Sequence, residues 1–100
     1  MKLKFEWDDE KAKVNLKKHR VSFDEAVTVF LDPFAMTIPD PDHSERSELR
    51  YIEIGSSDKC RLLVVVYTER GPTIRIISCR KANHFERICY EEGSKEGAIN

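Results

Sequence analysis

The pattern of apolar and polar positions predicts several short strands. Leu3–Trp7 alternates between the two classes and is expected to form a first strand. Phe34–Ile38 is expected to form a second, and the loop that follows contains Pro39 and Pro41, which a central strand would not tolerate. The pattern therefore places two strands in the first half of the chain.

Three more strands are predicted between residues 48 and 79. Alternation over Glu48–Ser56 puts two sets of residues on opposite sides of a strand: Arg50, Ile52 and Ile54 on one, Leu49, Tyr51 and Glu53 on the other. The most apolar segment, Arg61–Arg70, and then Thr73–Cys79 come next, and Gly55–Asp58 and Arg70–Pro72 between the segments are turn sequences. Such turns favour an antiparallel meander.

Capping residues mark two helices, and an apolar stripe predicts a third. Asp8 is expected to cap the first, with acidic residues in its first turn and Lys17, Lys18 and His19 in its last, as the helix dipole favours. Ser22 and Glu25 form a capping box for the second, whose predicted apolar stripe is Phe23, Ala26, Val27, Phe30 and Leu31. The third spans about Ala82–Glu92, with a predicted buried stripe of Ala82, Phe85, Ile88 and Cys89.

The predicted order is thus β-α-α-β-β-β-β-α, which indicates an α+β fold with helices packed on an antiparallel sheet. One hundred residues suit a single domain, which we place at 1–92, with a flexible tail at 93–100.

Composition excludes some classes of protein. The apolar runs are too short to cross a membrane, and Met1–Asp8 lacks the apolar core of a signal peptide, so a cytoplasmic protein is expected. The three cysteines and three histidines show no metal-ligand spacing, and neither a metal nor a cofactor is expected.

Charge is nearly balanced overall, at −1, but unevenly distributed. Residues 61–90 contain six Lys or Arg and two Glu, a net charge of +4. A locally basic segment of this kind can bind nucleic acid, although a solvated sheet face would have the same composition.

The junction Arg75–Tyr90 carries the most specific chemistry. An apolar strand ends on two adjacent cations, Arg80 and Lys81, and turns directly into a helix. Free N–H groups at a helix start, beside cations, favour phosphate binding. The junction therefore predicts a polyanionic ligand.

Several spaced residues together resemble the BrnT family: Phe5-x-Trp7-Asp8, Lys11, Asn15, Lys18-His19, Val21-Ser22-Phe23, Glu25-Ala26, Phe30-x-Asp32-Pro33, Asp42, Arg46, Gly55, Arg75-x-Ile77-Ser78-x-Arg80-Lys81-Ala82 and Glu86-Arg87-x-x-Tyr90. The resemblance implies a RelE-like ribonuclease toxin of a type II toxin–antitoxin pair. It also implies a BrnA-like antitoxin with a ribbon-helix-helix part, through which the complex would bind operator DNA. Arg20 and Cys79 depart from the family pattern, which has Gly and Ala there, and Arg20 must then end a helix without the conformational freedom of glycine.

Metal-independent RNA cleavage needs a base, cations that stabilise the phosphorane, and an acid. Arg80 is the first candidate for the stabilising cation, and Arg50 and Arg61 come next, because strands fix their direction. A salt bridge from Arg80 to Glu86 is the alternative. His43 on the Pro/Asp loop is the candidate base, with Glu48 as a further catalytic candidate, and a solvated loop histidine is the alternative for His43.

The expected RNA-binding residues are Arg61, Arg75, Lys81 and Tyr90. Ion pairs at the surface, and an aromatic clamp on the sheet for Tyr90, are the alternatives. Two functions from different classes follow. The first is a ribonuclease toxin, neutralised by its antitoxin, that inhibits translation by cutting RNA, which could be ribosome-bound. The second is a noncatalytic RNA-binding or co-repressor module.

Overall fold

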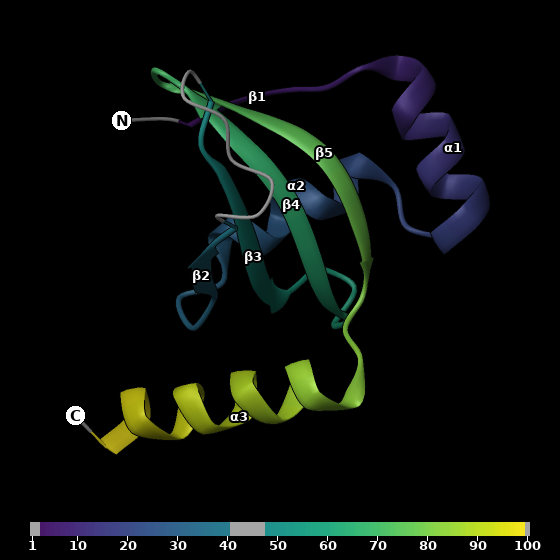
Figure 1. Cartoon of the computed structure of the whole chain (residues 1–100). Coiled ribbons are helices and arrows are strands. Elements are labelled where there is room, and N and C mark those ends of the chain that lie inside the picture. Colours follow the sequence, from purple (N-terminus) through teal and green to yellow (C-terminus); the bar gives the residue numbers. More distant parts are fainter. Residues whose placement is uncertain (1–2, 41–47, 100) are drawn as a thin grey trace.

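The computed structural model describes residues 3–40 and 48–99 (Figure 1). Its elements, in chain order, are β1 (Lys4–Glu6), α1 (Asp9–His19), α2 (Phe23–Thr28), the 3₁₀ turn η1 (Val29–Leu31), β2 (Met36–Pro39), β3 (Arg50–Ser56), β4 (Leu62–Arg70), β5 (Thr73–Lys81) and α3 (His84–Ile99). The α+β class is confirmed, and η1 is an element that the sequence did not predict. Within the described residues, no helix combines the length and apolar character needed to cross a membrane.

The five strands form one sheet in the order β1-β5-β4-β3-β2. The meander β3-β4-β5 is antiparallel as predicted, and β2 adds to it in antiparallel pairing. The prediction of a wholly antiparallel sheet is wrong at β1, which runs parallel to β5 through the register Lys4 to Thr73. Turn residues fix the direction only of strands that a turn joins, and no turn joins β1 to β5.

The helix caps form as the sequence predicts. Asp8 Oδ1 accepts a hydrogen bond from Lys11 N at 3.0 Å, and Ser22 Oγ accepts one from Glu25 N at 3.1 Å. Arg20 ends α1 in the left-handed conformation, with φ of 60°, and its N–H donates to Leu16 O at 2.9 Å. A non-glycine residue therefore occupies the position where glycine is favoured.

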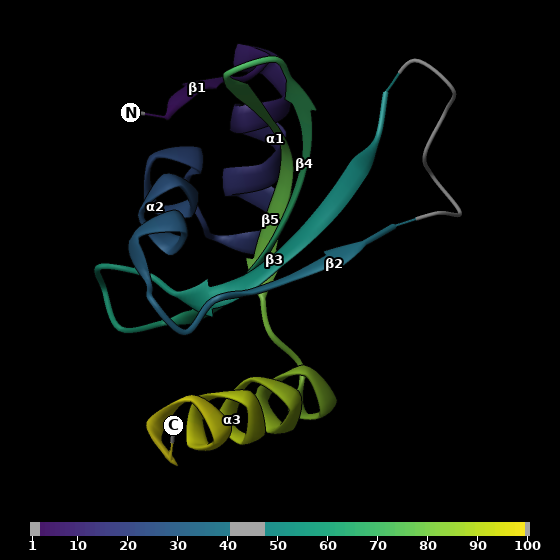
Figure 2. The same cartoon turned by 90° about the vertical axis from the view of Figure 1, so that its left-hand side faces the viewer.

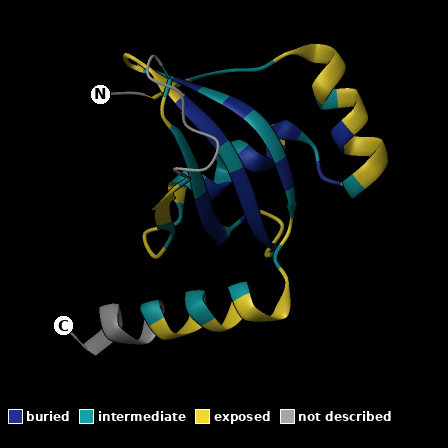
Figure 3. Cartoon of the chain, in the orientation of Figure 1, coloured by how far each residue is buried: buried dark blue, intermediate teal, exposed yellow. Residues whose placement is uncertain are grey.

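The sheet separates two faces, which we call the core face and the arginine face. The core face packs against α2 and η1, and its cluster includes Phe23, Ala26 and Val29 with sheet residues such as Leu63, Val65 and Ile76 (Figures 1 and 3). The arginine face consists of Arg50, Ile52 and Ile54 of β3, Val64, Val66 and Thr68 of β4, and Arg75, Ser78 and Arg80 of β5. It follows from strand alternation, since the neighbours of these residues point into the core.

The predicted apolar stripe of the second helix is wrong at Leu31, which is 81% exposed. The helix ends at Thr28 and the chain continues as η1, so its last turn follows a tighter repeat than an α-helix. Val29, which the stripe did not include, is buried instead.

Helix α3 lies at one end of the sheet rather than flat on it (Figure 2). Ala82 before it and Tyr90 within it pack against Ile54, Leu62 and Val64. The predicted buried stripe is wrong at Phe85, which is 73% exposed, and at Ile88, which is 39% exposed. The helix also extends to Ile99, beyond the end predicted at Glu92.

Asn15 joins α1 to the edge of β5. Its Nδ2 donates to Cys79 O at 2.8 Å and to Val21 O at 3.0 Å, and its Oδ1 accepts from Cys79 N at 3.0 Å. The amide therefore pairs with β5 as a neighbouring strand would, at a point beyond the end of β1. Asn15 is buried, so its three bonds are shielded from water.

Replacing Asn15 with alanine leaves three buried backbone groups without their partner. We expect Asn15→Ala to lower the free energy of unfolding by at least about 3 kcal/mol, because each of the three unsatisfied buried groups costs about 1–3 kcal/mol. Urea denaturation measures this change. Lys13→Ala, at an exposed position of the same helix, should change the free energy by less than about 0.5 kcal/mol. Equal stabilities of the two variants would contradict the anchoring role of Asn15.

Candidate nucleic-acid interface

Three arginines named as candidates from the sequence lie on one sheet face. Arg75 alternates with the buried Ile74 and Ile76 and therefore points away from the core. Arg80 follows the buried Cys79 in the same way, and Arg50 precedes Tyr51, which packs against the core cluster. The structure thus brings Arg50, Arg75 and Arg80 together on the arginine face.

The spacing of these arginines follows from strand register. Arg50 and Arg75 are both opposite Thr68, one on each side of β4, and their backbones are therefore about 10 Å apart. Arg80 is opposite Val64, about 13 Å along β4 from Thr68. These separations are larger than the width of one phosphate group, so the three arginines suit an extended polyanion.

Arg80 forms a two-point ion pair with Glu86. Its Nη1 and Nη2 each lie 2.7 Å from one oxygen of that carboxylate, so the salt-bridge alternative for Arg80 is observed. Asn83 N also donates to Glu86 Oε1 at 2.8 Å, and Glu86 N donates to Asn83 Oδ1 at 2.8 Å. A carboxylate from within the chain therefore stands at the helix start where the sequence predicted a phosphate.

The ion pair leaves part of the Arg80 guanidinium available. Nη1 gives its second bond to Lys81 O at 3.2 Å, and in the described part of the chain no hydrogen bond uses Nε. Nε–H and the second Nη2–H form the side fork of an arginine, which matches two phosphate oxygens. The Arg80 side chain is 43% exposed, so this fork can be reached from solvent.

The other two arginines have acidic neighbours. Arg75 Nη1 lies 2.5 Å from Glu6 Oε2. Arg70 donates to Glu48 Oε1 from Nε and Nη2, and these bonds, with the charge of Arg50, lower the pKa of Glu48. A lowered pKa makes Glu48 a weaker base than an ordinary glutamate.

Arg61 and Lys81 lie away from the arginine face. Arg61 pairs with the buried Glu25 of α2, to which Ser57 Oγ also donates at 2.6 Å. This pairing lowers the pKa of Glu25 and raises that of Arg61. Lys81 follows Arg80 directly on β5, and adjacent strand residues point to opposite sides of a sheet. The two adjacent cations of the sequence are therefore separated by the sheet.

Tyr90 serves as a clamp between α3 and the sheet. Its hydroxyl donates to Asp32 Oδ2 at 2.6 Å, and burial together with this bond raises its pKa to about 12. Asp32 also accepts from the backbone N–H groups of Ser56 and Phe34, which offset its burial and lower its pKa. His43, the candidate base, lies outside the described residues.

Sequence reasoning missed Glu53 as a buried carboxyl. It accepts a hydrogen bond from Thr37 Oγ1 at 2.6 Å and one from the Tyr67 hydroxyl at 3.3 Å, and burial raises its pKa. The sequence pattern contained a signal for this burial, because alternation placed Glu53 on the same side of its strand as Tyr51, which packs against the core cluster. In residues 3–40 and 48–99, no three His, Cys, Asp or Glu side chains gather as a metal site requires.

Comparisons with known proteins agree with this fold. The family model described as "Ribonuclease toxin, BrnT, of type II toxin-antitoxin system" matches residues 7–86. A solved structure, the crystal structure of the Brucella abortus ribonuclease toxin BrnT, superposes with a TM-score of 0.64 at 22% sequence identity. The match covers 83% of this chain and 100% of that one. No curated protein matches the chain.

An α+β fold with a five-stranded mixed sheet and three arginines on one face thus coincides with a family match over most of the sequence. The chain belongs to the BrnT family of ribonuclease toxins of type II toxin–antitoxin systems.

The Arg61–Glu25 pair gives a prediction about stability. Arg61→Ala leaves a buried carboxylate uncompensated and should lower the free energy of unfolding by about 3 kcal/mol. Because the folded pKa of Glu25 lies below its ordinary 4.5, the contribution of the pair is fully present above pH 4.5 and is lost as the pH falls through the lowered value. The difference between parent and variant should therefore shrink below pH 4.5 in chemical denaturation.

Arg70→Ala is the matched control, since it breaks the more exposed pair with Glu48 and should cost less than about 1 kcal/mol. A loss for Arg61→Ala no larger than this, or one that does not change with pH, would contradict a buried ion pair.

Proposed function

We propose that this chain is a RelE-like, metal-independent endoribonuclease that inhibits translation by cutting RNA bound on the arginine face. The single observation that carries the proposal is the common face of Arg50, Arg75 and Arg80 in a chain of the BrnT family. We further propose that it acts in the cytoplasm and is neutralised by a BrnA-like antitoxin with a ribbon-helix-helix part. Operator DNA would be bound only through that complex.

In the proposed reaction the 2′-hydroxyl of the RNA attacks the adjacent phosphorus and the bond to the 5′-oxygen breaks. Arg80 stabilises the charge on the phosphorane through the side fork that Glu86 leaves free. Arg50, which lies farther along the sheet, would hold a neighbouring phosphate of the same strand. Glu86 occupies the end of the guanidinium and so holds the fork in one orientation. We propose His43 as the base that takes the 2′-hydroxyl proton and, once protonated, as the acid that protonates the 5′-oxygen. Glu48 is the weaker candidate for either transfer, because its pKa is lowered and it pairs with Arg70, at the other end of β4 from the partner of Arg80.

For RNA binding we propose Arg75, whose side chain lies on the same face. Tyr90, which is bound to Asp32, would contribute by holding α3 beside the face. Arg61 and Lys81 point elsewhere, so we place them outside the proposed RNA-binding surface.

The first test compares two adjacent cations that face opposite ways. With a labelled RNA in EDTA, Arg80→Ala should reduce the cleavage rate at least about a hundredfold, because it removes the donors that stabilise the phosphorane. Lys81→Ala removes the same charge one residue away and should keep most of the activity. Circular dichroism confirms that both variants are folded. Equal losses in the two variants, or cleavage that requires added Mg²⁺, would contradict the proposal.

The near-neutral charge and the acidic partners of the arginines favour a second candidate, a noncatalytic binding module. Binding with a steep salt dependence and no cleavage of naked or translating message would support it. Cleavage confined to translating message would instead support a toxin that acts on ribosome-bound RNA.

A further inference from the structure

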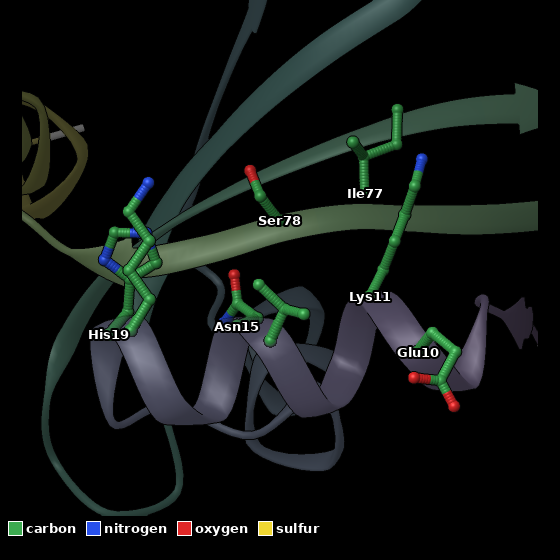
Figure 4. A pocket seen from close by; sticks show the side chains of 8 residues that line it. Glu10, Lys11, Asn15, His19, Ile77 and Ser78 are labelled. Carbon is green, nitrogen blue, oxygen red and sulfur yellow. The ribbon is translucent and has the colours of Figure 1, made fainter.

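A groove of about 330 Å³ lies between α1 and β5, beside the arginine face (Figure 4). β1 pairs only with Thr73–Arg75, so the rest of β5 has α1 as its neighbour on that side. The groove is lined by Glu10, Lys11, Val14, Asn15, Lys18 and His19 of α1 and by Ile77 and Ser78 of β5.

Two features fix the shape of the groove. Asn15 bonds to the backbone of Cys79 and holds α1 at a set distance from β5. Ile77 is the extra residue of a β-bulge, since Tyr67 is opposite Ile76 and Val66 is opposite Ser78. The side chain of Ile77 therefore lines the groove instead of continuing the alternation of β5.

The chemistry of the groove suits a nucleotide. Lys11, Lys18 and His19 are three basic residues on one side of α1, whereas Glu10 is the only acidic residue among the described residues that line the groove. Val14 and Ile77 supply apolar surface beside them, on which a base or ribose can pack. Cations next to apolar surface match the phosphate and the base of single-stranded RNA.

The alternative occupant, an acidic peptide added as a strand to β5, fits less well. Strand addition needs the outward N–H and C=O groups of the edge. At Cys79 both groups are already bonded to Asn15. RNA needs no such backbone pairing.

The groove also meets the arginine face. Ser78 lines the groove and lies on the same sheet face as Arg75 and Arg80. An RNA strand held by these arginines can therefore cross the edge of β5 at Ser78 and enter the groove.

We propose that the α1–β5 groove is a second RNA subsite, which binds a nucleotide flanking those on the arginine face through Lys11, Lys18 and His19. The proposal rests on the proposed function, because it extends the same bound strand. The proposal assigns the groove no preference for a particular base and no part in the cleavage step.

The test uses two double variants of α1 that remove the same charge. Lys11→Ala/Lys18→Ala alters the groove, and Lys13→Ala/Lys17→Ala removes two lysines that do not line it. All four lysines are exposed, so both variants should fold. The probes are fluorescent 2′-O-methyl RNAs of twelve and of four nucleotides with randomised sequence, which cannot be cut by 2′-hydroxyl attack.

For the twelve-nucleotide probe we expect the groove variant to bind about tenfold more weakly than the control variant. The slope of log affinity against log salt should become shallower by about 1.4, for two lost phosphate contacts with a single strand. For the four-nucleotide probe, which the arginine face can hold alone, the two variants should bind alike.

Equal binding of the long probe by both variants would overturn the groove proposal. A groove variant that loses affinity equally for the long and the short probe would overturn it too. So would a groove variant that loses only its neutralisation by the antitoxin, which would show a protein-binding groove. If Arg80→Ala weakens both probes while the lysine pairs do not differ, the groove proposal alone fails. If the unsubstituted protein binds neither probe, the groove proposal fails together with RNA binding as the proposed function.

Discussion

The carboxamide of Asn15 is the contact on which the arrangement of this small fold depends. β1 covers only the first part of β5, so an exposed strand edge would remain beyond Arg75. Asn15 satisfies that edge at Cys79 with one donor and one acceptor, and its second N–H binds Val21 O, where α1 leads into α2. One side chain therefore sets the position of α1 against the sheet and the entry of α2 into the core. It also fixes the groove between α1 and β5.

Three of the candidate arginines fall into two groups according to the side of the sheet on which they lie. Arg61 lies on the side of α2, where Glu25 is almost fully buried, and its charge is used to stabilise the fold. Arg75 and Arg80 lie on the other face, where they pair with the partly exposed Glu6 and Glu86. A phosphate can bind Arg80 through the side fork while Glu86 stays in place, but it could bind the paired guanidinium of Arg61 only by leaving the buried Glu25 unpaired. The division by face thus separates structural cations from those that a polyanion can reach.

The sequence was informative wherever the determining interaction is local. Turn residues predicted the meander, capping residues predicted the starts of α1 and α2, and Arg20 was correctly expected to close α1. Interactions between distant segments were not predictable from such signals. Three features join residues that no turn connects: the parallel pairing of β1, the bond from Asn15 to Cys79, and the position of α3 at one end of the sheet. In the candidate site, the sequence predicts Arg80 and Lys81 as one basic pair, because the predicted strand ends at Cys79. β5 continues to Lys81 through its pairing with β4, and alternation then places the two cations on opposite faces.

The acidic partners of the arginine face bear on how an RNA would be recognised. Arg75 and Arg80 each keep a carboxylate within hydrogen-bond distance, so the field of the face at long range is weak and RNA would gain little from steering. At short range the same pairing is an advantage, because Glu86 holds the guanidinium of Arg80 by its end and leaves the side fork oriented. A preorganised fork loses little side-chain entropy when a phosphate binds. Recognition of a polyanion at this face would therefore depend on short-range contacts to phosphate and not on long-range steering.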